Sequence, residues 1–74
     1  MIKLVPQTQV HNNHIDYLSE DGYSMSREYG EHEKTISGTF AGMWVLRNPD
    51  GEYLDHDRYR FDLVERNNAC IVEQ

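Results

Sequence analysis

The stretch TISGTFAGMWVLRNPDGEYL, residues 35–54, decides the fold. As far as Leu46, apolar residues and glycines recur at every second position and alternate with a second set, which is the period of a β-strand. Pro49 then fixes the φ angle that the second position of a turn requires, and Gly51 accepts the left-handed geometry that closes such a turn. The stretch therefore predicts a β-hairpin over residues 36–54.

Residues 55–67, which follow the hairpin, fit two kinds of element. Their aromatic and apolar side chains alternate with charged ones as in a strand, but helical spacing also brings Tyr59 against Leu63 for burial. Asp55 or Asp57 can cap the N-terminus of a helix, and an arginine stands in its last turn. We favour the helix, and the strand stays open as the alternative.

The N-terminal part of the chain has a weaker pattern. Residues 2–5 predict a short strand that Pro6 ends, and residues 7–14 are too polar to join a core, which indicates a loop. Residues 15–29 contain a good turn at positions 19–22, with apolar and aromatic residues on both sides of it, and therefore fit a short hairpin.

The remaining segments and the chain length complete the predicted fold. Residues 28–34 are charged around a glycine and indicate an exposed connection or a frayed helical turn, whereas residues 69–72 predict a strand. A length of 74 residues supports one small core, so we expect a single domain over residues 1–74. The predicted class is α+β: a small antiparallel β-sheet centred on the hairpin at 36–54, with one helix near 55–67 packed on it.

The charge balance is acidic along the whole chain. Seven Lys and Arg residues against thirteen Asp and Glu residues give a formal net charge of −6. The basic residues form no cluster, so we expect no direct binding to nucleic acid or to an anionic membrane. If electrostatic steering acts on association, the partner is a protein with a basic surface.

Cysteine usage and hydropathy indicate a reducing compartment. Cys70 is the only cysteine, so no disulfide can form within the chain. The sequence turns polar after its first five residues and contains no apolar stretch long enough to span a membrane. We therefore predict a cytoplasmic protein.

Four histidines and the cysteine are candidate metal ligands: His11, His14, His32, His56 and Cys70. A structural zinc site needs four ligands, usually as two close pairs. Here only the first two histidines form such a pair, and the spacing matches no zinc finger or ribbon. The sequence therefore predicts no metal and no other cofactor, while a small metal-stabilised domain stays open as an alternative.

Catalytic chemistry has one candidate motif. Asp55 and Asp57 flank His56, an arrangement that can raise the pKa of an imidazole for acid–base work. Capping of the N-terminus of a helix is a simpler interpretation of the same two carboxylates. Cys70 has apolar neighbours in the sequence, which is typical of a core residue. We therefore predict that the protein is not an enzyme.

Residues 44–66, WVLRNPDGEYLDHDRYRFDLVER, resemble the compact strand–turn–strand–helix pattern of small accessory proteins encoded by bacteriophages. The resemblance implies a class of roles, because many such proteins bind and inhibit a host enzyme or defence complex, and it implies the host cytoplasm as location. It transfers no functional residue. Our hypothesis is a stoichiometric inhibitor or regulator of a host protein or nucleic-acid-handling complex, with a homo-oligomeric structural subunit, for example a homodimer, as the alternative.

The predicted partner-binding residues are acids for steering and tyrosines for anchoring. They are Glu20, Asp21, Tyr23, Glu28, Tyr29, Glu31 and Glu33.

Overall fold

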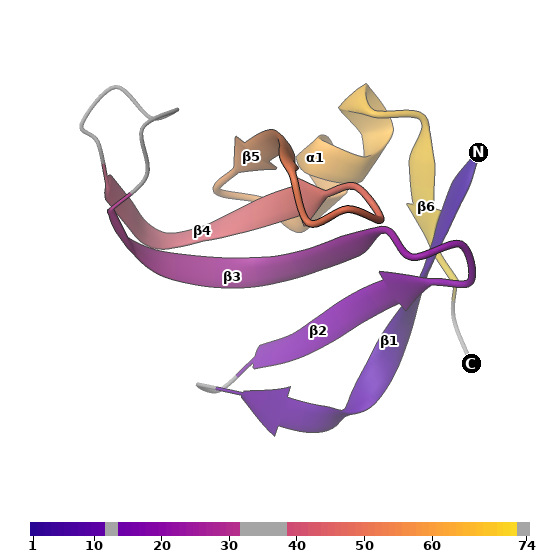
Figure 1. The fold of residues 1–74 in the computed structure, drawn as a ribbon, viewed down its shortest axis with the longest axis horizontal. Helices are drawn as coiled ribbons and strands as arrows, with labels where there is room; N and C mark the ends of the chain where they lie inside the picture. The colour runs from indigo at the N-terminus through magenta and orange to yellow at the C-terminus, as the bar shows by residue number, and fades with distance from the viewer. Residues whose placement is uncertain (12–13, 32–38, 73–74) are drawn as a thin grey trace.

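The chain folds into six strands and one short helix, and the computed structural model describes residues 1–11, 14–31 and 39–72. The elements are β1 (Ile2–His11), β2 (His14–Ser19), β3 (Ser24–Glu31), β4 (Thr39–Arg47), β5 (Tyr53–Asp57), α1 (Arg60–Arg66) and β6 (Ala69–Ile71). The strands form one sheet in the order β5-β4-β3-β2-β1-β6, which is strongly curled (Figure 1). Neighbouring strands are antiparallel except β1 and β6, which run parallel.

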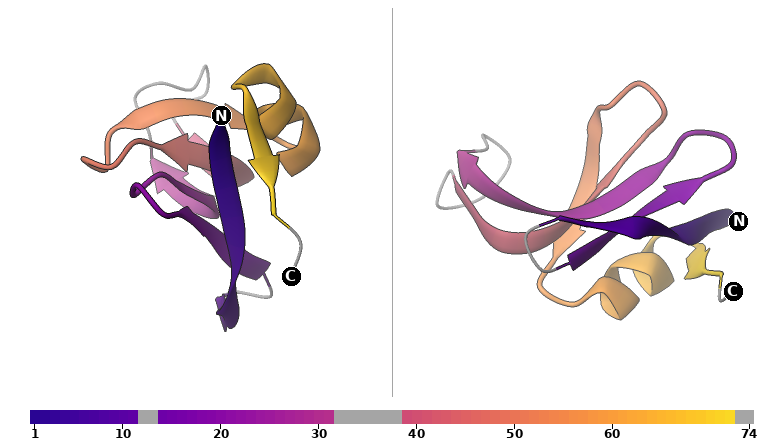
Figure 2. Two further views of the ribbon diagram at one scale, coloured as in Figure 1. Left: turned by 90° about the vertical axis from the view of Figure 1, so that its right-hand side faces the viewer. Right: turned by 90° about the horizontal axis from the view of Figure 1, so that it is seen from below.

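The helix connects the two edge strands of the sheet. α1 follows β5, precedes β6, and contacts both of them as well as β4. Figure 2 shows it on one face of the curled sheet. Its buried residues, Leu63 and Val64, belong to the core. The α+β class is correct, but the helix does not simply pack on the 36–54 hairpin, because it spans the opening between the two edges.

The core lies between α1 and the inner face of the sheet. Every strand but β5 contributes residues to it, and alternate positions supply them because strand side chains alternate between faces. The buried cluster is Leu4, Tyr17, Met25, Trp44, Leu46, Leu63, Val64 and Ala69.

The predicted hairpin around Pro49 is confirmed as β4 and β5, while residues 36–38 lie outside the described part of the chain. Asn48 organises its turn, since its side-chain oxygen accepts the N–H groups of Asp50 (3.0 Å) and Glu52 (2.9 Å). Gly51 has a φ of +82°, as this geometry requires.

The predicted hairpin around positions 19–22 is also confirmed, as β2 and β3. The Ser19 hydroxyl accepts the N–H of Tyr23 at 2.8 Å and holds this turn. Gly22 lies against the neighbouring turn, because a Cβ there would be 3.0 Å from the Cβ of Pro49. The two turns therefore touch at one end of the molecule (Figure 1).

The predicted loop over residues 7–14 is wrong, apart from positions 12–13, which lie outside the described residues. β1 runs on to His11, and β2 begins at His14. The predicted connection over residues 28–34 is also wrong as far as Glu31, because β3 extends to that residue; positions 32–34 are not described.

Pro6 does not end β1 because its missing N–H is not needed there. In this strand, Ile2 donates its N–H to the Asn68 carbonyl (3.2 Å), and Leu4 accepts the N–H of Val72 (2.8 Å). Alternate residues point their backbone groups to the same side, so Pro6 also faces the β6 side, beyond the point where β6 ends. A proline at such a position removes no ladder hydrogen bond.

Residues 55–67 contain both elements that their pattern allowed. The strand continues to Asp57 and the helix begins at Arg60, so the helix is shorter than predicted. The Asp57 carboxylate accepts the N–H of Tyr59 at 3.0 Å, which turns the chain between the two elements. The predicted burial of Tyr59 is wrong, because its side chain is 61% exposed, whereas Leu63 is fully buried.

The predicted strand at residues 69–72 is confirmed as β6. Its parallel pairing with β1 corrects the expectation of a purely antiparallel sheet.

Candidate protein-binding surfaces

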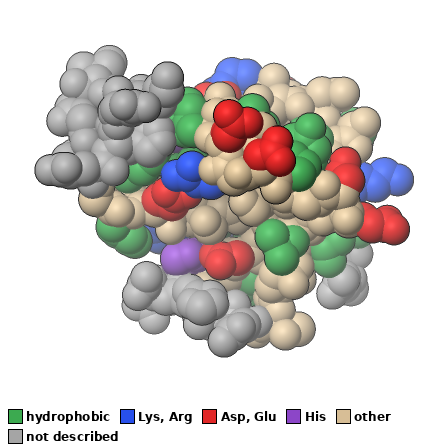
Figure 3. Space-filling model, in the orientation of Figure 1, with side chains coloured by type: hydrophobic (Ala, Val, Ile, Leu, Met, Phe, Trp, Pro, Cys, Tyr) green, Lys and Arg blue, Asp and Glu red, His purple; other side chains and the backbone are tan. Residues whose placement is uncertain are grey.

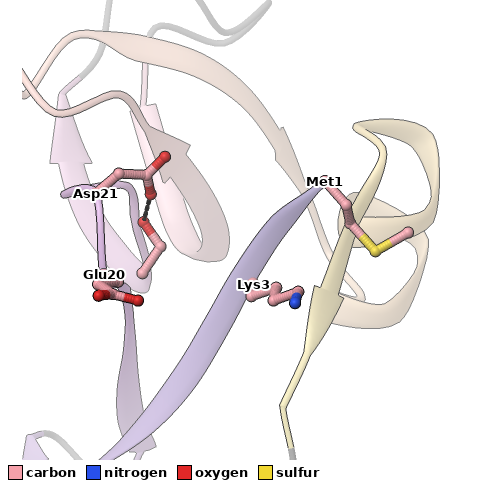
Figure 4. Close-up of a pocket in the computed structure, with 5 residues that line it drawn as sticks. Met1, Lys3, Glu20 and Asp21 are labelled. Atoms are coloured by element: carbon pink, nitrogen blue, oxygen red, sulfur yellow. Dashed lines mark hydrogen bonds between the residues drawn. The ribbon is translucent and has the colours of Figure 1, made fainter.

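Two of the predicted partner-binding residues, Glu20 and Asp21, lie exposed in the turn between β2 and β3. The Asp21 carboxylate accepts the Ser19 hydroxyl at 2.6 Å, which fixes its position. These residues line an open hollow of about 410 Å³ together with Met1, which precedes β1, and Lys3 of β1 (Figure 4). The turn thus presents two carboxylates at the surface, and a hydrogen bond fixes that of Asp21.

The neighbouring turn brings two further carboxylates to the same end of the molecule. Asp50 and Glu52 are exposed in the β4–β5 turn, which meets the β2–β3 turn through Gly22 and Pro49. Among the described residues, none of the four acids in the two turns forms an ion pair. We call Glu20, Asp21, Asp50 and Glu52 the acidic end. Sequence reasoning missed the second pair, because only the fold places the two turns together.

Glu28 and Tyr23 are placed differently from this acidic end. Glu28 accepts two hydrogen bonds from the Arg47 guanidinium, both 2.8 Å long, across the β3–β4 pair. Bonding to this carboxylate raises the pKa of Arg47 above its usual value. Tyr23 is partly buried and packs against the core. Both side chains are therefore less available to a partner than Glu20, which is exposed: Glu28 is bonded to Arg47, and Tyr23 is partly buried.

Tyr29 lies near the far end of β3 and is 57% exposed. The length of β3, about 23 Å at a strand rise of about 3.3 Å per residue, separates its two ends. Glu31 is the last residue of β3, and its side chain, like the whole of Glu33, lies outside what the structure describes. The predicted residues whose side chains the structure describes therefore do not form one continuous surface, and Figure 3 shows acidic side chains scattered among other types on the face it presents.

The side chains of Tyr29 and Arg27 pack against Gly42, at a bulge in β4. Gly42 has a φ of +81° and lies at a bulge, and its carbonyl accepts the Arg27 Nε–H at 3.0 Å. A Cβ at this position would lie 2.8 Å from Arg27 Nη2 and 3.1 Å from Tyr29 Cε2. Glycine is required here both by the backbone and by the two side chains.

The carboxylates beside His56 are bonded to the helix and not to the imidazole. Arg66 donates to Asp55 (2.8 Å), to Asp57 (2.9 Å) and to the His56 carbonyl (3.0 Å). The His56 ring lies on the other face of β5, as strand alternation dictates, with Nδ1 2.6 Å from the Tyr53 hydroxyl. The sequence motif is therefore divided between two faces.

These bonds shift the acidity of both carboxyl groups. Burial acts to raise the pKa of Asp55, but hydrogen bonds from Arg66 and Asn67 outweigh it and the pKa is lowered. The N–H of Tyr59 and then the Arg66 guanidinium lower the pKa of Asp57.

The candidate metal ligands are dispersed among the described residues, which contain no group of three or more His, Cys, Asp or Glu side chains able to hold a metal. His14 is buried, with Nε2 3.1 Å from the Asp16 carboxylate and its ring against Trp44. Cys70 is partly buried in β6. The side chain of His11 and the whole of His32 lie outside the described part of the chain.

A second hollow lies between α1 and β6 and was not predicted. We call it the helix groove. Its volume is about 500 Å³, and its lining is mostly apolar: Tyr17, Arg60, Phe61, Val64, Glu65, Ala69, Cys70 and Ile71. The sequence carries no signal that distinguishes Arg60, which lines this groove, from Arg58, which lies on the exposed surface.

No helix among residues 1–11, 14–31 and 39–72 has the length and apolar composition needed to cross a membrane. A scan of protein-family models, a search of curated proteins and a search of solved structures each find no match to this chain.

Proposed function

We propose that this protein is a small acidic protein-binding module that acts as a stoichiometric inhibitor or regulator of a partner with a basic surface. The observation that carries the proposal is the acidic end, where the turn with Glu20 and Asp21 lies against the turn with Asp50 and Glu52. Carboxylates that are exposed and unpaired, on a chain with a net charge of −6, attract a basic surface over a distance of about one Debye length.

Hydrogen bonds within the turns hold two of these four carboxylates in place. Asp21 is bonded to Ser19, and Glu52 accepts a hydrogen bond from Asn48 at 3.1 Å. Groups that are already ordered lose less conformational entropy when a partner binds. The acidic end is therefore suited to fast, oriented association.

The distribution of positive charge supports a protein partner over nucleic acid. Arg27, Arg47 and Arg66 each donate to oxygen atoms within the fold. Phosphate binding needs several clustered Lys and Arg side chains that are free to release counterions, which the described residues do not provide.

The inhibitory role rests on the resemblance to small bacteriophage proteins. An acidic module of this size can occupy the basic groove of a nucleic-acid-handling complex and so compete with its substrate. The host cytoplasm is the compartment that this role requires.

The first test is to express the tagged chain in a bacterial host and to identify co-purifying proteins by mass spectrometry at low and high salt. We expect one stoichiometric partner with a basic surface, which high salt releases. A chain that purifies alone at both salt concentrations would contradict the proposal.

The second test measures association with the partner so identified. The double variant Glu20→Gln/Asp21→Asn removes two charges and keeps the hydrogen-bond acceptor for Ser19, so we expect a several-fold lower on-rate at low salt and convergence with wild type at high salt. The control Asp62→Asn removes one exposed charge from α1, outside the helix groove, and should change the on-rate by less than half as much. Equal effects of the two variants would rule out the acidic end as the steering surface.

A further inference from the structure

Each of the two turns at the acidic end contains an aspartate followed by a glycine. Asp21 precedes Gly22 in the β2–β3 turn, Asp50 precedes Gly51 in the β4–β5 turn, and all four residues are exposed. In such a pair, the backbone nitrogen of the glycine can attack Cγ of the aspartate, because glycine has no Cβ to hinder the approach. Whether the attack occurs in a folded chain depends on how freely the carboxyl group and the glycine can move.

The two carboxyl groups differ in their freedom. Asp21 Oδ1 accepts the Ser19 hydroxyl at 2.6 Å, and the oxygen of this hydroxyl accepts the N–H of Tyr23 at 2.8 Å, so the Asp21 side chain is anchored within its turn. The Asp50 carboxylate forms no hydrogen bond or ion pair with any residue that the structure describes. Its Cγ can therefore rotate toward the nitrogen of Gly51 without breaking a side-chain interaction.

The two glycines differ in the same direction. Each donates its N–H to a carbonyl of its own turn, Gly22 at 3.1 Å and Gly51 at 2.9 Å, so this bond does not distinguish them. Gly22 is packed against the other turn, because a Cβ there would lie 3.0 Å from the Cβ of Pro49, whereas no atom lies within 4 Å of the corresponding position at Gly51. The peptide group between Asp50 and Gly51 therefore has the room to rotate that cyclisation requires.

We infer that Asp50 is a site of spontaneous isomerisation to isoaspartate and that the fold protects Asp21 from the same reaction. The nitrogen of Gly51 forms a bond to Cγ of Asp50, and the hydroxyl of the protonated carboxyl group leaves with the amide hydrogen as one water, which gives a succinimide ring. A water molecule then opens the ring. Attack at Cγ restores aspartate, whereas attack at the backbone carbonyl carbon leaves the chain running through Cγ, as isoaspartate. The water lost in the first step returns in the second, so no other reactant is needed.

Isomerisation changes the shape of the β4–β5 turn and preserves its charge. The main chain becomes longer by one carbon, the Cβ of Asp50, and the released α-carboxylate replaces the side-chain carboxylate. Three hydrogen bonds of 2.9–3.1 Å between Asn48 and Glu52 span the lengthened segment, so we expect them to weaken and Pro49 to shift away from Gly22. This inference goes beyond the proposed function, because the reaction takes place in the isolated chain and needs no partner.

The test is to incubate the folded wild-type chain at physiological temperature and neutral pH and to take samples over several weeks. Trypsin releases the two aspartate–glycine pairs in separate peptides, residues 4–27 and 48–58. Mass spectrometry with electron-transfer fragmentation distinguishes isoaspartate from aspartate, and the loss of one water identifies the succinimide. We expect isoaspartate to form at least about tenfold faster at Asp50 than at Asp21, because Asp21 must first break a hydrogen bond to its charged carboxylate.

Unfolding the chain and changing single residues test the physical cause. In concentrated urea both pairs lose their turns, so the two rates should converge. Ser19→Ala removes the hydroxyl that anchors Asp21 and should raise the rate at that residue several-fold while leaving Asp50 unchanged. Asp50→Glu keeps the charge but cannot form a five-membered ring, so it should give almost no isomer at position 50. Thermal unfolding of each variant establishes that it is folded.

The effect on the neighbouring turn is followed by NMR, in which the amide signal of Gly22 should shift in the isoaspartate form. The inference is overturned if the folded chain isomerises equally fast at Asp21 and Asp50, or if only the unfolded chain isomerises at Asp50. It is also overturned if the difference between the two rates persists in urea, if Ser19→Ala leaves the rate at Asp21 unchanged, or if the Gly22 signal does not move. All these measurements use the isolated chain, so their outcome is independent of whether a basic partner is found.

Discussion

Replacing Gly42 by alanine tests the packing of the β4 bulge. A non-glycine residue at its φ of +81° costs about 1–2 kcal/mol. The new Cβ would also lie 2.8 Å from Arg27 Nη2, so Arg27 has to move, and its bond to the Gly42 carbonyl, worth about 1.5 kcal/mol, is weakened or lost. We expect Gly42→Ala to lower the free energy of unfolding by about 2–4 kcal/mol, which corresponds to at least about 10 °C in Tm for a domain of this size.

The matched control is Gly51→Ala. Gly51 has nearly the same φ, +82°, but no atom lies within 4 Å of the position that a Cβ would take. It should cost only the backbone term of about 1–2 kcal/mol. Urea unfolding followed by Trp44 fluorescence measures both variants. If Gly42→Ala costs no more than Gly51→Ala, then the contact of Gly42 with Arg27 and Tyr29 contributes nothing, and this reasoning is refuted.

Two further predictions concern α1. Leu63→Ala should lower the free energy of unfolding by about 2–5 kcal/mol, because a fully buried leucine leaves a cavity at the helix–sheet contact, and a loss below about 1 kcal/mol in urea unfolding would show that α1 is not part of the cooperative core. Asp55 and Asp57 have pKa values lowered below 3.8 in the folded state, so their contribution to stability is complete above about pH 4 and is lost as the pH falls through the folded-state values. Arg66 is 49% exposed, so Arg66→Gln should remove about 1 kcal/mol or less near pH 7 and progressively less as the pH falls through the folded-state pKa values of the two carboxyl groups, whereas an effect that does not change with pH would argue against the ion pairs as its cause.

Local patterns predict the hairpins of this fold well. The turn at Pro49 and Gly51 is set by residues adjacent in sequence, and the same holds for the turn closed by Gly22, so both could be predicted. The path of β1 beyond Pro6 could not, because whether a proline interrupts a sheet depends on which side its missing N–H faces. That side is set by β6, more than sixty residues later in the chain.

The candidate surfaces depend even more on tertiary structure. The acidic end needs two turns from different hairpins to meet, and only the close approach of Gly22 to Pro49 shows that they do. Arg58 and Arg60 are equivalent in sequence, and only the position of Arg60 between two aromatic rings sets it apart. Conversely, the Asp-His-Asp motif suggested a single site that strand alternation divides between two faces.

The parallel pair of β1 and β6 has a consequence for how the chain folds. Ile2 pairs with Ala69, 67 positions later, whereas Leu18 pairs with Ser24, only six positions later. Closing the longer loop costs about 2 kcal/mol more in chain entropy. We therefore expect the local hairpins to form before β1 pairs with β6. During synthesis on a ribosome, the inner face of the sheet therefore stays uncovered and β1 keeps an unpaired edge until α1 and β6 have emerged from the exit tunnel, and the apolar residues of the core are open to chaperones until that moment.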